Sequence, residues 1–276
     1  MASNNITLGA ASRSNLLSLQ STTNLIGRTQ GRLSTGLKVA SALDDASAFF
    51  TARSLSNRAG DLTGVKNKID QAISAVSNAV QAIDSATKIV EQIRGIAESA
   101  KSASTAAERS TLGNQAELLA VQLNNLINDS SYNGVNLLKA TPDNLEVNFN
   151  EDSTVELTVT GTNLTAANLG ADISTVTNNW GTVGDINADV NEYASALGQL
   201  RTASQTFGSN ATLLSTRKEF TETLVNTLKE GADKLTLADL NEEGANLLAL
   251  QTRQQLGINA LSLASQSEQA VLSLFR

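Results

Sequence analysis

Residues 69–90 read IDQAISAVSNAVQAIDSATKIV and carry the pattern that decides the fold. Large aliphatic side chains recur in this stretch with alternating spacings of four and three residues. They are Ile69, Ile73, Val76, Val80, Ile83 and Val90, with Thr87 completing the alternation. Such spacing predicts a helix with an apolar seam that packs against a second helix. Flanking alanines would let a partner helix approach closely, and they are Ala72, Ala75, Ala79, Ala82 and Ala86.

Heptads resume in a second long segment that starts at Ile186. One seam position repeats every seven residues and a second position complements it. The first holds Ile186, Tyr193, Leu200, Phe207 and Leu214, and the second holds Val190, Leu197 and Ala211. This spacing predicts a helix that runs to about Lys229. A shorter helix that ends near Asn128 is indicated by Leu112, Leu119, Leu123 and Leu126.

Both ends of the chain carry heptads with polar interruptions. Near the N-terminal end, one seam position holds Leu19, Ile26, Leu33 and Ala40, and the other holds Leu16 and Leu37. Near the C-terminal end, the frame holds Leu240, Leu247, Leu261 and Phe275, interrupted by Gln254 and Glu268. Glycines at positions 27, 31 and 36 weaken the first helix by about 1 kcal/mol each relative to alanine. We therefore expect the two terminal helices to lie side by side, in a chain that folds back on itself.

The middle of the chain changes to strand periodicity. Val147 and Phe149 alternate with polar residues, as do Val155, Leu157 and Val159. Two such runs around residues 150–153 predict a β-hairpin. Residues 161–184 are rich in Thr, Asn and Gly and predict a loop, with a helical turn near residues 166–169. The predicted fold class is thus mainly α, with long coiled-coil helices and a small β-hairpin region.

Charge is unevenly distributed along the 276 residues, whose net charge is −7. Residues 140–200 contain nine acids and neither Lys nor Arg, which argues against a nucleic-acid-binding protein. The first 43 residues contain four bases and no acid, and we expect them to complement the acidic C-terminal segment that starts at Gly231. No run of apolar residues is long enough to predict insertion into a membrane.

The composition excludes most catalytic and metal sites. The chain contains neither Cys nor His, which rules out thiol nucleophiles, His-based triads and most zinc, haem, iron–sulfur and copper sites. Asp44 and Asp45 could form an acid–base or metal pair, but neighbouring residues of a helix point about 100° apart. We interpret them as loop, cap or interface residues, and we expect neither enzymatic activity nor a cofactor.

Two further features receive structural interpretations. Asn148, Asn150 and Asp152 alternate like the start of a calcium-binding loop. Ser153 and Val159 stand where such a loop requires Gly and Glu, so the rim of a hairpin is the better interpretation. Trp180 is interpreted as an apolar anchor for the loop that enters the second long helix.

Three stretches of the sequence resemble one protein family. Residues 32–46 read RLSTGLKVASALDDA, residues 132–138 read YNGVNLL, and the stretch from Ala245 onward ends in VLSLFR. In this order they resemble the N-terminal signature, the turn after the first helical hairpin and the C-terminal helix of the bacterial flagellins. The resemblance covers almost the whole chain and leaves little sequence for a large outer domain.

The resemblance implies a tube with an inner layer of terminal helices and a surrounding layer of central helices. It assigns residues 1–43 and 231–276 to the inner layer, 44–140 and 185–230 to the two halves of the central helical domain, and 141–184 to the acidic hairpin and loop. Inner-layer assembly then falls to Leu16, Leu19, Ile26, Leu33, Leu37, Leu240, Leu247, Leu250, Leu261, Val271, Leu272 and Phe275. The central coiled coil falls to Ile69, Ile73, Val76, Val80, Ile83, Val90, Ile186, Val190, Tyr193, Leu197, Leu200, Phe207 and Leu214.

The implied function is structural. A flagellin is secreted by type III export and polymerises into the extracellular filament of the flagellum, which drives swimming. The implied partners are copies of the same chain, the export apparatus, an export chaperone, the filament cap and the hook-junction proteins. Two alternatives stay open, namely a hook–filament junction protein and a secreted coiled-coil adhesin or effector.

Flagellins are also recognised by an innate immune Toll-like receptor through a patch on the first central helix. Arg94 and Ile96 keep the residue types that the family has at this patch. Gln92 stands where an Arg is expected, and Gly95 where a Glu is expected. We expect weak or absent receptor activation, because charge-assisted contacts are lost.

Overall fold

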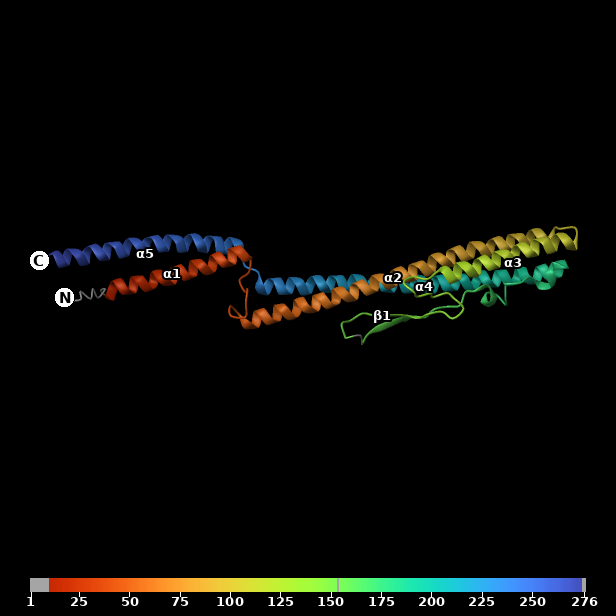
Figure 1. Ribbon diagram of the computed structural model, residues 1–276, viewed down its shortest axis with the longest axis horizontal. Coiled ribbons are helices and arrows are strands. Elements are labelled where there is room, and N and C mark those ends of the chain that lie inside the picture. Colours follow the sequence, from red (N-terminus) through yellow and green to blue (C-terminus); the bar gives the residue numbers. More distant parts are fainter. Residues whose placement is uncertain (1–9, 153, 275–276) are drawn as a thin grey trace. The chain divides into compact units, whose positions relative to one another are not determined.

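A computed structural model describes residues 10–152 and 154–274, and it is mainly α-helical (Figure 1). The helices are α1 (Ala10–Thr35), α2 (Ala46–Lys101), α3 (Ala106–Asp129), α4 (Val183–Thr236) and α5 (Leu240–Leu274). The remaining elements are strands β1 (Leu145–Asn148) and β2 (Glu156–Val159) and the short 3₁₀ helices η1 (Ala166–Asn168) and η2 (Thr177–Trp180). The chain divides into a larger unit, residues 58–227, and a smaller unit formed by the described residues before and after it. The predicted fold class is confirmed.

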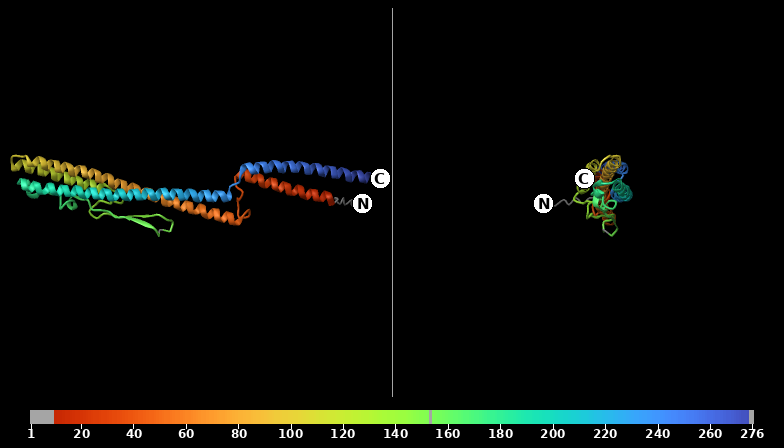
Figure 2. Two further views of the ribbon diagram at one scale, coloured as in Figure 1. Left: turned by 180° about the vertical axis from the view of Figure 1, so that it is seen from behind. Right: turned by 90° about the vertical axis from the view of Figure 1, so that its right-hand side faces the viewer.

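The larger unit is built around parts of α2 and α4 with α3 beside them (Figure 2). One continuous apolar core joins the three helices, the hairpin and the two 3₁₀ helices. A capping box begins α3, because Thr105 accepts a hydrogen bond from the Glu108 amide and Glu108 accepts one from the Thr105 amide. The chain thereby reverses between α2 and α3 within a few residues.

The seam of α2 differs from the predicted one in its second position. Ile69, Val76, Ile83 and Val90 are fully buried, as predicted. The second seam position between them is held by the buried Ala72, Ala79 and Ala86, with Ala75 and Ala82 also buried, whereas Ile73 and Val80 are half-buried. Small side chains at alternate layers let the neighbouring helices approach closely, and the larger aliphatic side chains then cover the flanks of the contact.

The other helices of the larger unit show the same shift. In α4, Ile186, Tyr193, Leu200, Phe207, Leu214 and Val190 are buried as predicted. Asp189, Ala196 and Ala203 are buried as well, while Leu197 and Ala211 are half-buried. In α3 the buried residues are Gly113, Ala116, Ala120, Leu123 and Ile127, and the predicted Leu112, Leu119 and Leu126 lie beside them half-buried. Helix α4 also continues past the predicted end near Lys229, to Thr236.

The predicted β-hairpin and helical turn are confirmed. Strands β1 and β2 pair antiparallel, with Leu145 opposite Val159 and Asn148 opposite Glu156. Val147 and Val159 point into the core. Asn150 at the hairpin end accepts hydrogen bonds from the amides of Thr154 and Val155, so its side chain closes the turn rather than forming part of a metal site. The predicted turn near residues 166–169 is η1.

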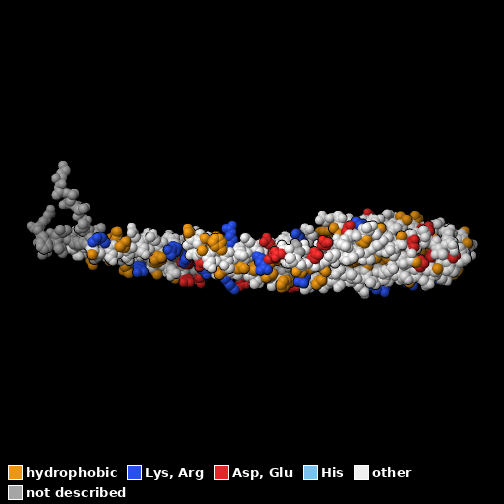
Figure 3. All heavy atoms as spheres, turned by 90° about the horizontal axis from the view of Figure 1, so that it is seen from below, with side chains coloured by type: hydrophobic (Ala, Val, Ile, Leu, Met, Phe, Trp, Pro, Cys, Tyr) orange, Lys and Arg blue, Asp and Glu red, His pale blue; other side chains and the backbone are white. Residues whose placement is uncertain are grey.

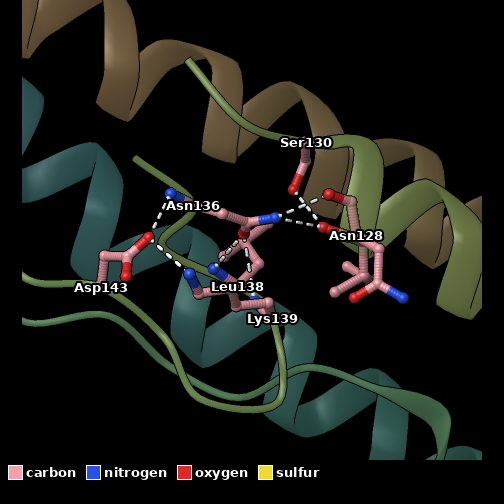
Figure 4. A network of polar contacts seen from close by, with 7 residues as sticks. Asn128, Ser130, Asn136, Leu138, Lys139 and Asp143 are labelled. Atoms are coloured by element: carbon pink, nitrogen blue, oxygen red, sulfur yellow. Dashed lines mark hydrogen bonds and ion pairs between the residues drawn. The ribbon is translucent and has the colours of Figure 1, made fainter. Parts of the chain in front are cut away.

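A tight turn and a network of polar contacts hold the stretch YNGVNLL in place (Figure 4). Asn133 and Gly134 have φ values of 51° and 83°, which the tight turn between Tyr132 and Val135 requires. The buried Asn136 side chain donates hydrogen bonds to the carbonyls of Ile127 and Asn128 at the end of α3. The side-chain oxygen of Asn136 accepts hydrogen bonds from the amides of Leu138 and Lys139, and these bonds hold the chain in place after it leaves α3.

A short left-handed turn precedes α4. Asn178, Asn179 and Trp180 have φ values of 46°, 51° and 52°. This conformation is unfavourable for a residue as bulky as Trp. The buried Trp180 indole donates to an Asp189 carboxylate oxygen at 2.6 Å, and Arg109 donates to the carbonyls of Trp180 and Gly181. Trp180 thus anchors the loop, as predicted, and α3 and α4 together hold the strained turn.

In the smaller unit, α1 packs against α5 in the antiparallel direction. Gly36, with a φ of +72°, ends α1 through a hydrogen bond from its amide to the Arg32 carbonyl. The Asp44 carboxylate then accepts hydrogen bonds from the Ser41 hydroxyl and from the amides of Ser41 and Ala40. The bond from the Ser41 hydroxyl, together with the two amide bonds, lowers the pKa of Asp44. Asp45 accepts the Ala48 amide at the start of α2. The two aspartates are therefore loop and cap residues, as interpreted from the sequence.

Candidate assembly surface

The α1–α5 pair buries little apolar surface. Among the side chains of α1 that the structure describes, the buried ones are Ser12, Thr22, Ile26 and Thr29, three of them polar. Among the side chains of α5 that the structure describes, Glu243 alone is buried. Leu19 packs against Gly257, where an added Cβ would lie 3.1 Å from a Leu19 carbon. The second seam position of α1 is again one residue from the predicted one. Thr22 and Thr29 are buried, whereas Leu16, Thr23 and Gln30 in the predicted frame are exposed.

Large apolar side chains remain on the surface of this pair. On α5, Leu248, Leu256 and Leu263 are 67%, 63% and 70% exposed and lie on one face at spacings of eight and seven residues. On α1, Leu17 is 66% exposed, and Leu25 is exposed as well. The space-filling view shows hydrophobic side chains, drawn in orange, at the molecular surface (Figure 3). Two helices that leave so many leucines in water have an unpartnered apolar surface.

The predicted inner-layer residues divide into three groups. Ile26 is buried, and Leu19, Leu33, Leu37, Leu247, Leu250 and Leu261 are half-buried in the smaller unit. Leu16 and Leu240 are exposed. Phe275 lies outside the described residues, as do the side chains of Val271 and Leu272. The exposed leucines of α5 were missed because the heptad frame at Leu247 and Leu261 fitted the sequence, although a second stripe one or two residues away could have indicated them.

The predicted charge complementarity between the two ends of the chain is realised in one place. Arg32 and Glu243 form an ion pair at 2.7 Å, and Glu243 is buried. It is the one ion pair between α1 and α5 within the residues that the structure describes. The other bases of α1 and the other acids near the start of α5 remain exposed.

Within the larger unit, the acidic segment is partly neutralised by neighbours. Asp189 is buried and accepts three hydrogen bonds, so it does not contribute to the surface. Glu151 pairs with Arg58 at 2.6 Å and Asp143 with Lys139 at 2.8 Å. The Lys139 hydrogen bond lowers the pKa of Asp143, so this carboxylate stays ionised to lower pH.

The residues predicted to correspond to the receptor patch lie on α2. Gln92, Arg94 and Gly95 are exposed and Ile96 is half-buried. A Cβ added to Gly95 would have no neighbour within 4 Å, so a larger side chain fits there without rearrangement.

Within the described ranges, no cluster of acidic side chains could hold a metal ion, and none of the helices there is both long and apolar enough to cross a membrane. The candidate site is the apolar face of the α1–α5 pair, whose leucines are exposed to water in the single chain.

Comparison with known proteins identifies the family of the chain. Residues 6–143 match the bacterial flagellin N-terminal helical region, and residues 181–275 match the bacterial flagellin C-terminal helical region. Two flagellins of Caulobacter vibrioides, FljM and FljO, are 31% and 32% identical over the full length of both chains. A crystal structure of Bacillus cereus flagellin aligns with 56% of this chain and 88% of its own, at a TM-score of 0.48 and 15% identity.

The matches span both helical regions in the predicted order and favour a filament subunit over the junction-protein and adhesin alternatives. By these matches the chain belongs to the bacterial flagellins, the structural subunits that polymerise into the flagellar filament for swimming.

Proposed function

We propose that the α1–α5 pair forms the inner layer of this filament and that the larger unit forms the layer around it. The observation that carries the proposal is the exposure of Leu248, Leu256 and Leu263 along one face of α5. Burying apolar area is worth about 25 cal/mol per Å², so copies that cover these leucines gain stability that one chain lacks.

The same observation bears on the free subunit. Polar side chains at Ser12, Thr22 and Thr29 make the α1–α5 seam weak, and isolated helices of this kind are marginal in water. We infer that the pair is loosely ordered in the monomer and becomes fully ordered on assembly. The core of the larger unit, with its buried Trp180, Tyr193 and Phe207, is complete within one chain.

The remaining parts of the proposal concern the path of the chain and its surroundings. The subunit crosses the type III export apparatus unfolded with help from an export chaperone, and it meets the filament cap and hook-junction proteins outside the cell. The absence of Cys and the single Pro suit a chain that must refold quickly after export. The subunit acts mechanically and without enzymatic activity, and the acidic segment 140–200 gives the filament a negative exterior.

Seeded polymerisation of the full-length chain tests the layer assignment. Purified monomer is mixed with sheared filament seeds, and elongation is followed by light scattering and electron microscopy. We expect the variant Leu248→Ser/Leu256→Ser to lose elongation while its larger unit melts as in the parent. Leu118→Ser is the matched control, because Leu118 on α3 is 65% exposed and lies in the larger unit. Elongation by the α5 variant at the parental rate would refute the assignment.

A further inference from the structure

The α1–α5 pair carries a groove of about 310 Å³ whose charge is unbalanced. We call it the basic groove, and its polar lining consists of Arg28, Thr29, Arg32, Glu243, Asn246 and Arg253. Arg32 is paired with Glu243. Arg28 and Arg253 are exposed, and neither forms an ion pair with any residue in the described part of the chain. Three guanidinium groups thus face one carboxylate.

The same unit carries acidic groups at the start of α5. Asp239 and Glu242 are exposed and have no ion-pair partner among the residues described. Asp239 accepts the amides of Asn241 and Glu242, which fixes its carboxylate at the start of the helix. We call Asp239 and Glu242 the acidic end.

Within one chain, the acidic end does not neutralise the groove: neither Asp239 nor Glu242 forms an ion pair with a groove arginine among the described residues. Glu242 and Arg253 are eleven residues apart on α5, which corresponds to about 16 Å along the helix axis. Arg32 already uses Glu243, the acid nearest to the groove. The opposite charges therefore remain available to a second molecule.

We propose that the basic groove of one copy binds the acidic end of a second copy, and that this contact joins neighbouring subunits in the inner layer. The inference rests on the proposed function, since it requires the α1–α5 pairs of different copies to meet. Two different, complementary patches on one chain form a head-to-tail contact, and such contacts generate open helical assemblies when the rotation does not close a ring.

The chemistry of the contact sets its character. Guanidinium groups form bidentate hydrogen bonds with carboxylates, so Arg28 and Arg253 select an acidic partner and fix its position. The groove lies between α1 and α5, and ion pairs across an interface determine register and association rate more than total affinity. Its contribution weakens as salt shortens the range of the attraction.

A charge-exchange experiment tests the contact in the full-length chain. The measured quantity is the critical concentration for elongation of parental seeds and of self-nucleated filaments. Reversal of either partner, by Arg253→Glu or Glu242→Arg, is expected to raise the critical concentration by about fivefold or more. The double variant Arg253→Glu/Glu242→Arg restores attraction between copies of itself, and its self-nucleated filaments are expected to form within about twofold of the parental value.

Arg13→Glu is the matched control, because Arg13 is an exposed arginine of α1 outside the groove and the charge change is the same. Single reversals that act no more strongly than this control would overturn the contact, as would a double variant that fails to recover. A parent chain that elongates no seeds would instead overturn the proposed function. Elongation by the parent that is unaffected by both reversals overturns the contact alone.

Discussion

The second seam position of α2 gives the sharpest test of how the larger unit is packed. Ala79 is 1% exposed at this position, whereas its neighbour Val80 is half-buried on the flank. The substitution Ala79→Leu inserts three carbon atoms where the neighbouring helices approach closely. Overpacking of this kind costs about 1–3 kcal/mol. In a unit of this size, each kcal/mol lowers the Tm by about 2–4 °C, so we expect a decrease of roughly 2–12 °C.

The adjacent substitution Val80→Leu is the control. It adds one methylene on the flank of the contact, and we expect the free energy of unfolding to change by less than about 0.5 kcal/mol. The assay is thermal unfolding followed by tryptophan fluorescence. Trp180 is the single tryptophan of the chain and is buried in the larger unit, so the signal reports that unit alone. A harmless Ala79→Leu together with a destabilising Val80→Leu would show that the seam runs through Val80 instead.

Three further predictions concern the larger unit. Trp180→Phe removes the indole donor to the buried Asp189 carboxylate, and we expect a loss of about 1.5–3 kcal/mol in urea unfolding; an unchanged midpoint would contradict the role of this bond. Burial raises the pKa of Glu192, with the nearby Asp189 charge adding to the effect, so its ionised form destabilises the fold above the ordinary Glu pKa. Glu192→Gln should therefore raise the Tm at neutral pH, with a gain that disappears once both folded and unfolded chains are protonated at low pH, whereas a gain independent of pH would refute this cause. The double substitution Gln92→Arg/Gly95→Glu should increase Toll-like receptor signalling in a reporter cell line, and no increase over the parent would contradict the assignment of the patch.

The sequence predicts the helices well because their apolar periodicity is strong. Ile69, Val76, Ile83 and Val90 all occupy the buried seam that their spacing predicts. The prediction failed at the second seam position, where it chose the larger of two neighbouring residues. The spacings 69-73-76 and 69-72-76 both fit a heptad, so periodicity alone cannot choose between Ile73 and Ala72. The choice depends on how closely the partner helices approach, which is a property of the assembled core.

Local turn chemistry was visible in part. The Asn133-Gly134 pair predicts a tight turn, and the structure confirms it with positive φ at both residues. The left-handed turn at Trp180 could not be predicted, because it depends on hydrogen bonds with Arg109, which is 71 residues away, and with Asp189 on the helix that follows. The sequence of α5 contains two neighbouring stripes of leucines, and only the structure shows which of them α1 leaves uncovered.

The central claim is that the α1–α5 pair is completed by other copies of the chain. Amide hydrogen exchange, read by mass spectrometry on monomer and on filament, tests it most directly. We expect the amides of α1 and α5 to exchange quickly in the monomer and to gain strong protection in the filament, while the core of the larger unit, around Ile83 and Leu200, is protected in both. Equal protection of α1 and α5 in the two states would contradict the account.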